Sequence, residues 1–368
     1  MSDKIKILIG VESLGGGVLR HIVDLCLNLN KEKYELHLVS SLFHVNEETN
    51  ESIRLLQNNG TETTFINIAH NLSWTDGQTI NYIAKYIRKH NISIVHAHST
   101  KAGVIFRIAA FICRKPCCYT PHCFYFESRK GVKRFLAFYM EKFLSSLCKK
   151  IILSENEYLS AVRNKIARKE KLHIINNSID SRNYTKYQRD KILTELNIPQ
   201  QNIVIGGVGR LVPQKNWQAF IYTAAVLIDS RKNISFIISG DGPEKENLLD
   251  LSGRLGITDK IIFTGHTENI SKIYSCIDIF VSCSLWEGLP YSYLEAVHYN
   301  LPMFLSDINH IREYFKNYAY YFDPSRPEEL LSLILKYMDH RPTANKSLQH
   351  RNKFEDFIKL HEKLYDNL

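Results

Sequence analysis

The sequence lacks the features that mark several classes of protein. No apolar run approaches the roughly 20 residues that span a bilayer, which excludes an integral membrane protein. The N-terminus passes from a short polar start straight into apolar residues, without the charged, apolar and cleavage regions of a signal peptide. We therefore expect the chain to stay in the cytosol. Internal repeats and low-complexity tracts are also missing, which favours ordinary globular domains.

Motifs for metals and disulfides are equally scarce. The eight cysteines include no Cys-x-x-Cys pair, and their spacing matches no zinc framework. We interpret them as buried thiols of a reducing compartment. His96 and His98 alternate at the end of an expected strand, so we expect only one of them to face a ligand. No carboxylate cluster stands beside them, and we predict no metal site.

The composition fits two globular domains whose charge is unevenly shared. The 368 residues are 44% hydrophobic and 23% charged, with a net charge of +9. Residues 1–180 hold 25 Lys and Arg against 16 Asp and Glu, whereas residues 181–368 hold 22 of each. The first half should therefore meet an anionic partner. Nucleic acid, a phospholipid surface and a phosphorylated substrate are all compatible with this charge.

Short apolar runs alternate with amphipathic stretches along nearly the whole chain. This alternation is typical of an α/β fold with parallel sheets covered by helices on both faces. The polar segment 181–199 interrupts it, so we predict a first domain over 1–180, a connection, and a second domain over 200–350. Two such doubly wound, Rossmann-like domains bind ligands outside the carboxyl ends of their strands, in a central cleft.

Three loops carry candidate chemistry. Gly15-Gly16-Gly17 follows the first expected strand, where bare backbone can approach a phosphate or sugar. Arg210 and Lys215 lie on the loop after the first strand of the second domain, where two cations can converge on one diphosphate. Glu287 and Glu295 flank a Gly-Leu-Pro turn between a strand end and a helix start. Two carboxylates in this setting resemble hydroxyl acceptors on either side of a phosphate, more than an acid–base pair.

The segment Glu127–Lys150 is the best candidate for contact with a membrane. It carries seven Lys and Arg against two glutamates, interleaved with aromatic and aliphatic residues. Such a helix can lie on anionic lipid, each cation contributing about 1 kcal/mol near the surface. An ordinary amphipathic helix packed on the sheet explains the pattern equally well.

These residues carry a resemblance to a known family. The stretch from Glu287 to Ala296 is similar to the E-x7-E element of the family 4 retaining glycosyltransferases, which have the two-domain GT-B fold. Other segments follow in the family's order along essentially the whole chain, and the first half resembles enzymes that build bacterial O-antigens, capsules and lipid-linked glycans. These segments are Gly15–Gly17, His96–Ser99, Thr120–His122, Gly209–Lys215, Gly240–Pro243 and Phe263–His266.

The resemblance implies a role for each motif. Arg210 and Lys215 would bind the diphosphate of a nucleotide sugar, and Glu295 the ribose. Glu287 would contact the donor sugar, with His122 beside the reacting centre. The remaining implied contacts are Gly288, Leu289, Pro290 and Tyr291 with the distal phosphate, Gly16 and Gly17 with the diphosphate, and Gly265 and His266 with the base. The last helix, 353–368, would pack back on the first domain.

The implied reaction is a metal-independent, retaining sugar transfer, with a UDP-sugar as the favoured donor and no cofactor. The sequence contains no Asp-x-Asp motif with which to hold Mg²⁺. The implied acceptor is a lipid-linked, lipopolysaccharide or capsular glycan at the inner face of the cytoplasmic membrane. Two departures from the family bear on the sugar pocket. Cys123 stands where the family often has glycine, and Tyr291 and Tyr293 replace smaller residues.

Two alternatives are weaker. A GT-B sugar-nucleotide epimerase would share the fold, but the E-x7-E context argues against it. A basic nucleic-acid-binding protein would explain the charge of the first half, but the chain lacks the recognisable motifs and stacking platforms of such proteins. We therefore expect no nucleic-acid partner.

Overall fold

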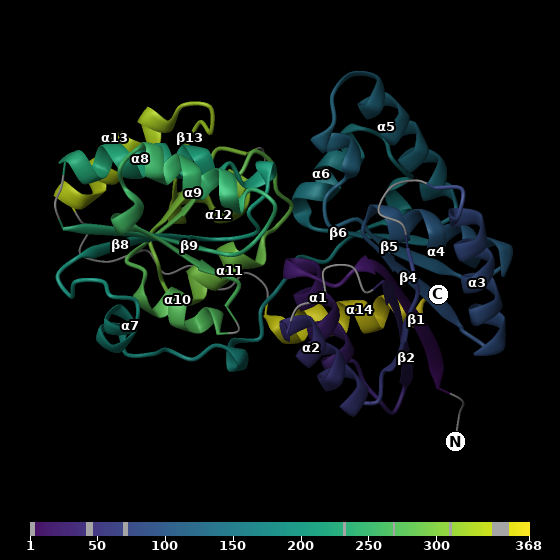
Figure 1. The fold of residues 1–368 in the computed structure, drawn as a ribbon. Coiled ribbons are helices and arrows are strands. Elements are labelled where there is room, and N and C mark those ends of the chain that lie inside the picture. Colours follow the sequence, from purple (N-terminus) through teal and green to yellow (C-terminus); the bar gives the residue numbers. More distant parts are fainter. Residues whose placement is uncertain are drawn as a thin grey trace. The chain divides into compact units, whose positions relative to one another are not determined.

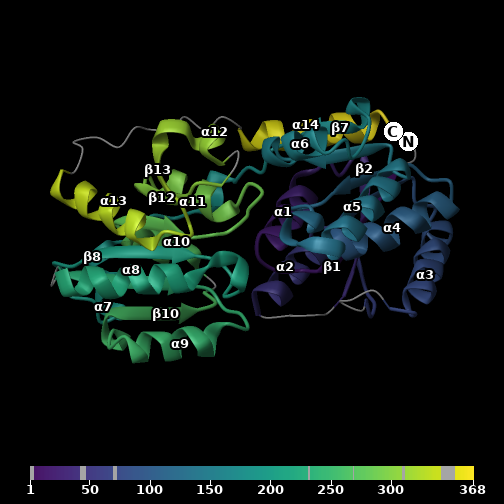
Figure 2. The same cartoon turned by 90° about the horizontal axis from the view of Figure 1, so that it is seen from above.

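The computed structural model describes residues 4–41, 47–68, 73–230, 233–267, 269–308, 311–340 and 353–368. The chain divides into two compact units, one of residues 1–178 with 352–368 and one of residues 179–351. Each unit contains a parallel sheet covered by helices on both faces (Figures 1 and 2). The α/β fold class of two doubly wound sheets is therefore confirmed.

The first unit has a seven-stranded sheet in the order β3-β2-β1-β4-β5-β6-β7. The order reverses between β1 and β4, which creates the switch point where doubly wound sheets bind their ligands. Six of the strands carry apolar residues buried in the core clusters on the two faces of the sheet, and β3 contributes the partly buried Phe65. The strands are β1 (Ile5–Ser13), β2 (Tyr34–Ser41), β3 (Glu62–Phe65), β4 (Ile94–His98), β5 (Cys117–Thr120), β6 (Lys150–Leu153) and β7 (Leu172–Ile174).

The last helix of the chain, α14 (Phe354–Asp366), belongs to this first unit. Its buried Phe357 and Tyr365 pack into the same core cluster as β1 and α1. Burial of a large side chain contributes about 1.5–3 kcal/mol, so α14 is an integral part of this unit. It covers one face with α1 (Gly16–Asn28) and α2 (Glu47–Asn58) (Figure 1). The other face is covered by α3 (Asp76–Lys89), α4 (Thr100–Ile112), α5 (Gly131–Ser146) and α6 (Glu155–Arg163).

The second unit has a six-stranded sheet in the order β10-β9-β8-β11-β12-β13, with its switch point between β8 and β11. On one face lie α8 (Trp217–Ser230), α9 (Lys245–Arg254) and α13 (Pro327–Asp339). On the other lie α7 (Arg189–Glu195), α10 (Ile270–Cys276), α11 (Tyr291–His298) and α12 (Ile311–Phe315). The strands are β8 (Ile203–Val208), β9 (Ile234–Ser239), β10 (Ile261–Gly265), β11 (Ile279–Ser282), β12 (Met303–Ser306) and β13 (Ala319–Phe322).

The segment 181–199, which we expected to connect the domains, lies within the second unit. It forms α7, and Ile192, Leu193 and Ile198 are buried in the core cluster that also contains α10 and α11. Of the polar residues that suggested a connection, Asp190, Lys191, Thr194 and Glu195 form the exposed face of this short amphipathic helix, and residues 181–188 precede it. Among the described residues, no helix is both long and apolar enough to cross a bilayer.

Candidate functional site

In the second unit, the two candidate cations follow β8. The loop continues from Gly209 through a short 3-10 turn, Pro213–Lys215, and Asn216 then takes a left-handed conformation (φ 50°) before α8 begins. Trp217 donates its indole N–H to the carbonyl oxygen of Arg210 at 2.9 Å, which fixes the loop on the buried start of α8. The Arg210 side chain extends into solvent, so it is available to an anion.

Lys215 contacts the loop that follows the neighbouring strand β11. Its Nζ lies 2.5 Å from Glu287 Oε1, and both side chains are largely buried. Gln214 strengthens the link at two atoms. Its side-chain amide donates to the carbonyl oxygen of Trp286 at 2.8 Å, and its backbone carbonyl oxygen accepts from the Leu285 N–H at 2.8 Å. The structure therefore brings together Lys215 and Glu287 at the β8/β11 switch point, where the sequence analysis placed the diphosphate and the donor sugar.

Two glycines allow the loop after β9 to approach the loop after β8. A Cβ atom on Gly240 would lie 2.0 Å from the carbonyl oxygen of Gly209, and one on Gly242 would lie 2.4 Å from that of Leu211. The Leu211 N–H donates to the carbonyl oxygen of Asp241 at 2.9 Å across the same contact. Larger residues would push the two loops apart. The Gly-Asp-Gly sequence is thus explained by backbone contact within the site.

Gly265 ends β10 and lies beside the same loops. It has a φ of 67°, which glycine adopts without strain, and its carbonyl oxygen accepts from Gly240 N–H at 2.9 Å. His266 follows it and is exposed. The strand ends β8, β9, β10 and β11 therefore carry the candidate base, diphosphate and sugar contacts along one edge of one sheet.

Glu295 lies one turn inside α11, as its position after Gly-Leu-Pro predicted, and is 9% exposed. Its two carboxylate oxygens each accept a hydrogen bond at 2.8 Å, Oε1 from the Tyr184 hydroxyl and Oε2 from the Tyr274 hydroxyl. Burial, and to a smaller extent the Glu295 carboxylate, raises the pKa of Tyr274 well above its ordinary value. This tyrosine therefore keeps its proton and donates it to the hydrogen bond. Sequence reasoning missed both tyrosines because they lie far from Glu295 along the chain.

The turn before α11 places Pro290 directly before the helix, which begins at Tyr291. Leu289 is buried, and Gly288 is partly exposed. Tyr293, which we expected to shape the sugar pocket, instead points into the core and donates its hydroxyl to Ser282 Oγ at 2.8 Å.

In the first unit, two candidate loops flank the β1/β4 switch point and its neighbour β5. Gly16 and Gly17 begin α1, and both are exposed. Gly16 has a φ of 53°, and no atom within 4 Å would meet a Cβ there. An open loop of this kind at a helix N-terminus leaves backbone N–H groups accessible to an anion.

His122 and Cys123 form an unusual turn after β5. Both residues have left-handed backbones, with φ values of 54° and 104°, which are strained for residues other than glycine. Cys123 occupies the position where the family often has glycine, and its φ explains that preference. The turn is held by Glu157, whose Oε1 accepts the Cys123 N–H at 2.5 Å. Burial raises the pKa of Glu157, and Ser154 orients it through the capping box of α6.

A cluster of buried histidines surrounds this turn. His98 Nδ1 lies 3.0 Å from His122 Nε2, and the two rings are stacked. His21 is buried and meets the His122 ring edge to face, with centroids 4.8 Å apart. His96 and His361 complete the cluster. Burial lowers the pKa of all five rings, to about 3 for His122 and about 4 for His361. The cluster is therefore neutral at physiological pH.

The expectation that only one of His96 and His98 can face the site is wrong. Residues two apart on a strand point to the same face of the sheet, and the two rings lie 4.0 Å apart between centroids. His96 makes structural contacts, with its nitrogens bonded to the Tyr365 hydroxyl at 2.7 Å and to Thr120 Oγ1 at 2.9 Å. Of these two histidines, His98 is the one that hydrogen-bonds His122.

Two groups of side chains in the described part of the chain are spaced closely enough to share a metal ion. One is His21, His98 and His122, and the other is the partly exposed set of His37, Glu62 and His90. In both groups, hydrogen bonds within the protein already engage ring nitrogens. The prediction that the site needs no metal stays a prediction.

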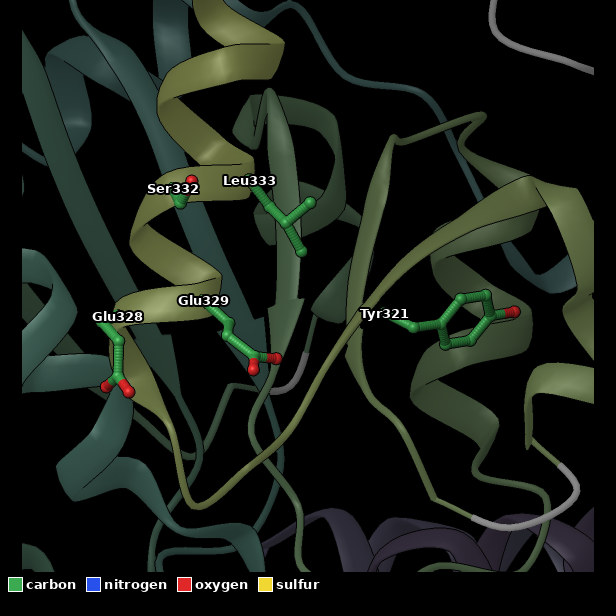
Figure 3. A pocket seen from close by; sticks show the side chains of 5 residues that line it. All are labelled: Tyr321, Glu328, Glu329, Ser332 and Leu333. Atoms are coloured by element: carbon green, nitrogen blue, oxygen red, sulfur yellow. The ribbon is translucent and has the colours of Figure 1, made fainter.

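A hollow on the second unit lies away from the candidate residues. Figure 3 shows Glu328, Glu329, Ser332 and Leu333 on α13, with Tyr321 on β13 and its ring directed away from that helix. Glu329 already accepts the Asp323 N–H at 3.0 Å. Because the polar groups do not converge and one is engaged, we assign this hollow no function.

The comparisons with known proteins cover nearly the whole chain. Residues 15–183 match the model described as Glycosyltransferase Family 4, and residues 188–355 match the model described as Glycosyl transferases group 1. Among solved structures, HepE of Anabaena in complex with UDP-glucose has a TM-score of 0.83 at 19% identity, covering 99% of this chain and 100% of that one. TarM has a TM-score of 0.73 at 13% identity over 99% of both chains. These structures share the fold.

Curated relatives match shorter stretches. An Escherichia coli α-1,3-galactosyltransferase, named for UDP-Gal and α-D-GlcNAc-diphosphoundecaprenol, is 31% identical over 243 residues, which are 64% of this chain and 62% of that protein. The capsular polysaccharide glycosyltransferase CapM of Staphylococcus aureus is 27% identical over 58% of each chain. The match thus spans less than two thirds of these relatives. With both halves matched by glycosyltransferase models and a GT-B arrangement of two Rossmann-like units, the chain belongs to the family 4 glycosyltransferases.

Proposed function

We propose that the protein transfers a sugar from a nucleotide-sugar donor, most favourably a UDP-sugar, to a lipid-linked, lipopolysaccharide or capsular glycan. One observation carries the proposal. The second unit places Arg210, Lys215, Glu287 and Glu295 at the carboxyl edge of a single sheet around its switch point. This is where doubly wound sheets bind nucleotides, and cations beside hydroxyl-accepting carboxylates suit a nucleoside diphosphate linked to a sugar.

In this proposal the side chains act on the leaving diphosphate. Negative charge builds on the phosphate as the glycosyl bond breaks, and positioned cations stabilise it. Arg210 is exposed and can close on the phosphate oxygens. Lys215 pairs with Glu287 in this structure, so it would share its charge between the phosphate and that carboxylate. Glu295, oriented by two tyrosines, would accept the ribose hydroxyls. The reaction would retain the anomeric configuration and need no metal.

The donor and acceptor classes rest on the named relatives. HepE was crystallised with UDP-glucose, and the Escherichia coli relative is named for UDP-Gal and a diphosphoundecaprenol-linked GlcNAc. Together they support a UDP-sugar donor and a lipid-linked acceptor for this chain.

A thermal-shift screen of UDP, GDP, ADP and their sugars, with EDTA present, tests the donor site. A ligand at 100 times its dissociation constant stabilises the folded state by roughly 2.7 kcal/mol. We expect a shift with UDP and its sugars, which Lys215→Met reduces. The matched control Lys272→Met removes an exposed lysine of α10 that pairs with Glu195 of α7, and it should leave the shift intact. No shift with any nucleotide would contradict the proposal.

Transfer itself is measured with a lipid-linked acceptor and the donor that the screen selects. We expect an anomeric configuration in the product that matches the donor, at a rate that EDTA does not change. An inverted product, or activity that appears only with a divalent cation, would contradict the retaining or metal-independent part of the proposal. Epimerisation of the nucleotide sugar without any acceptor would instead indicate the epimerase.

We further propose that α5 binds the anionic inner face of the cytoplasmic membrane. The helix buries only Ala137, Glu141, Leu144 and Ser145, while an apolar row along it is exposed. The fractions exposed are 74% for Val132, 60% for Phe135, 63% for Leu136, 52% for Tyr139 and 66% for Phe143. The Lys133, Arg134 and Lys142 side chains are exposed on the same helix. A helix packed on the sheet would not leave this apolar row in water, whereas a helix at a membrane interface needs both exposed apolar residues and exposed cations.

Vesicle flotation tests this surface. We expect binding to vesicles containing phosphatidylglycerol, weaker binding at high salt, and little binding to phosphatidylcholine alone. The double substitution Phe135→Ser and Phe143→Ser should release the protein. The control Val226→Ser, at an exposed apolar position on α8, should not. Salt-insensitive or absent binding would overturn the proposal.

A further inference from the structure

The contact between His98 and His122 determines what His122 can do chemically. Their ring nitrogens, Nδ1 of His98 and Nε2 of His122, lie 3.0 Å apart, so one proton is shared in a hydrogen bond between them. His98 is fully buried at the end of β4, and His122 is partly buried on its strained turn. The Glu157 carboxylate fixes that turn through the Cys123 N–H. Neither ring can therefore turn away without breaking a buried contact.

The hydrogen-bond partners of the remaining ring nitrogens decide which ring donates. His98 Nε2 is buried and has no hydrogen-bond partner among the described residues. If it carried the proton, a buried N–H would be left unpaired, which is rarer in proteins than an unpaired acceptor. The proton of His98 is therefore assigned to Nδ1, which donates to His122 Nε2. Since the hydrogen bond at one nitrogen sets the tautomer of a neutral imidazole, His122 then carries its own proton on Nδ1.

His21 supports the same assignment. Its Nδ1 lies 3.2 Å from the carbonyl oxygen Oδ1 of Asn177, which can only accept. His21 therefore also holds its proton on Nδ1, and its buried Nε2 is a lone pair without a partner among the described residues. Its ring packs edge to face on His122. The His21 ring thus holds His122 in place and donates no hydrogen bond to it.

We infer that His98 is a positioning residue that fixes the proton of His122 on Nδ1, so that His122 meets the substrate as a neutral hydrogen-bond donor and not as a base. The inference rests on the proposed function only in naming the substrate, a nucleotide sugar. The Nε2 lone pair of His122 is occupied by His98, and Nδ1–H is what remains for a ligand. A donor of this kind pairs with a hydroxyl or phosphate oxygen of the sugar nucleotide and orients it. It cannot abstract the acceptor's proton.

Nitrogen-15 NMR of histidine-labelled protein tests the assignment without any substrate. The His122 signals are identified by their loss in His122→Gln. We expect the wild-type spectrum at pH 7 to show His122 protonated at Nδ1 and bare at Nε2. His98→Leu, which removes the donor, should move the His122 proton at least partly to Nε2. His98→Asn keeps an amide nitrogen near the position of Nδ1 and should restore the wild-type tautomer.

The matched control is His96→Leu, on the same strand and equally buried. It removes bonds to Tyr365 and Thr120 and should lower stability while leaving the His122 tautomer as in the wild type. In the transfer assay, loss of one oriented hydrogen bond corresponds to about a 10-fold lower kcat. We expect this for His98→Leu with the donor KM changed less than about twofold, and recovery of most of the rate in His98→Asn.

The outcomes separate this inference from the proposed function. A wild-type His122 protonated at Nε2, or a tautomer that His98→Leu does not alter, overturns the inference whatever the activity. The expected tautomers together with no sugar transfer from any nucleotide sugar would support the inference about His98 and refute the transferase proposal.

Discussion

The buried histidine cluster should make the first unit sensitive to acid. Its five rings are His21, His96, His98, His122 and His361, whose pKa values burial lowers most, with smaller contributions from neighbouring imidazoles for several of them. Their hydrogen-bond partners outside the cluster are neutral groups, such as the Asn177 amide and the Tyr365 hydroxyl. Protonation in the folded state is therefore strongly disfavoured.

The sign of the effect follows from proton binding. The folded pKa values lie below the ordinary value of about 6.5, so the unfolded chain binds more protons between about pH 6.5 and pH 3–4. Stability is thus fully present above about pH 7 and falls as the pH decreases through this window. Burial raises the pKa of Glu157, so this single carboxyl group opposes the trend at pH values above its ordinary pKa.

The magnitude is large compared with the stability of a protein. At pH 5.5 an imidazole of the unfolded chain is about 90% protonated. Each ring that stays neutral in the folded state therefore lowers the free energy of unfolding by about 1.4 kcal/mol. The five rings of the cluster together cost about 7 kcal/mol, whereas whole domains are stable by about 5–15 kcal/mol. We expect the first unit to lose most of its stability between pH 7.5 and pH 5.5.

His361→Leu isolates one ring of the five. His361 donates from Nδ1 to the carbonyl oxygen of Phe357 in its own helix at 2.9 Å, and its Nε2 has no partner among the described residues. Leucine fills this apolar site without a titrating group. We expect the variant to equal the wild type within about 1 kcal/mol at pH 7.5 and to exceed it by about 1.4 kcal/mol at pH 5.5.

Urea unfolding at the two pH values measures this difference, and hydrogen exchange of β4 peptides identifies the transition of the first unit. The control Phe357→Leu should lower the free energy of unfolding equally at both pH values, because it removes packing and no proton. A wild type equally stable at pH 5.5 and 7.5, or a His361→Leu variant with the wild-type pH dependence, would refute the reasoning.

Further predictions concern strain, a buried ion pair and the nucleotide. Cys123→Gly should raise the free energy of unfolding by about 1 kcal/mol, because φ 104° strains a residue with a Cβ atom; an unchanged urea midpoint would mean that no strain is stored there. Arg107 and Glu141 form a buried ion pair with two hydrogen bonds of 2.7 and 3.1 Å. Glu141→Leu should therefore lower the free energy of unfolding by about 3–5 kcal/mol, and adding Arg107→Met should recover part of this loss in the same measurement. Tyr274→Phe should weaken UDP binding about fivefold in calorimetry, because a donor to the proposed ribose-binding carboxylate is lost. Tyr293→Phe, whose hydroxyl bonds Ser282 in the core, should bind UDP as the wild type does.

Much of the architecture was predictable because it depends on local patterns. Every strand of the structure falls on a run that the alternation of apolar and amphipathic stretches had identified, apart from shifts at the ends. One such shift is at β4, because the apolar run Ile92–His96 predicts the strand and the structure has it over Ile94–His98. Ile92 is apolar and buried, but its N–H bonds back to Ile87 at the end of α3, so strand pairing begins only at Ile94. Hydrophobicity alone does not separate a helix-terminal contact from a strand.

Short helices escaped the sequence analysis for a different reason. α2 and α7 are rich in polar residues, and their few apolar residues are buried by other elements. Helices of this kind are stabilised by tertiary packing more than by propensity. The polar surface of α7 therefore made residues 181–199 look like a connection.

The chemical groups of the site, and the edge of the sheet on which each one lies, follow from the sequence alone. Arg210, Lys215 and Glu287 lie on loops that follow strands, and Glu295 lies one turn inside the next helix. Parallel strands in a doubly wound sheet end at one edge. This placement needs only the order of elements along the chain. The family resemblance supplied the chemistry expected of them.

Only the tertiary structure decided which groups touch. Three sets of contacts join residues 21 to 111 positions apart. They are the Lys215–Glu287 pair, the tyrosines that orient Glu295, and the contact of His98 with His122. Such contacts depend on which loops the sheet order brings together and on how deeply each ring is buried. The local periodicity of the sequence specifies neither. Burial also sets the protonation of the cluster, because the free energy of a charged imidazole depends on its surroundings rather than on its neighbours in sequence.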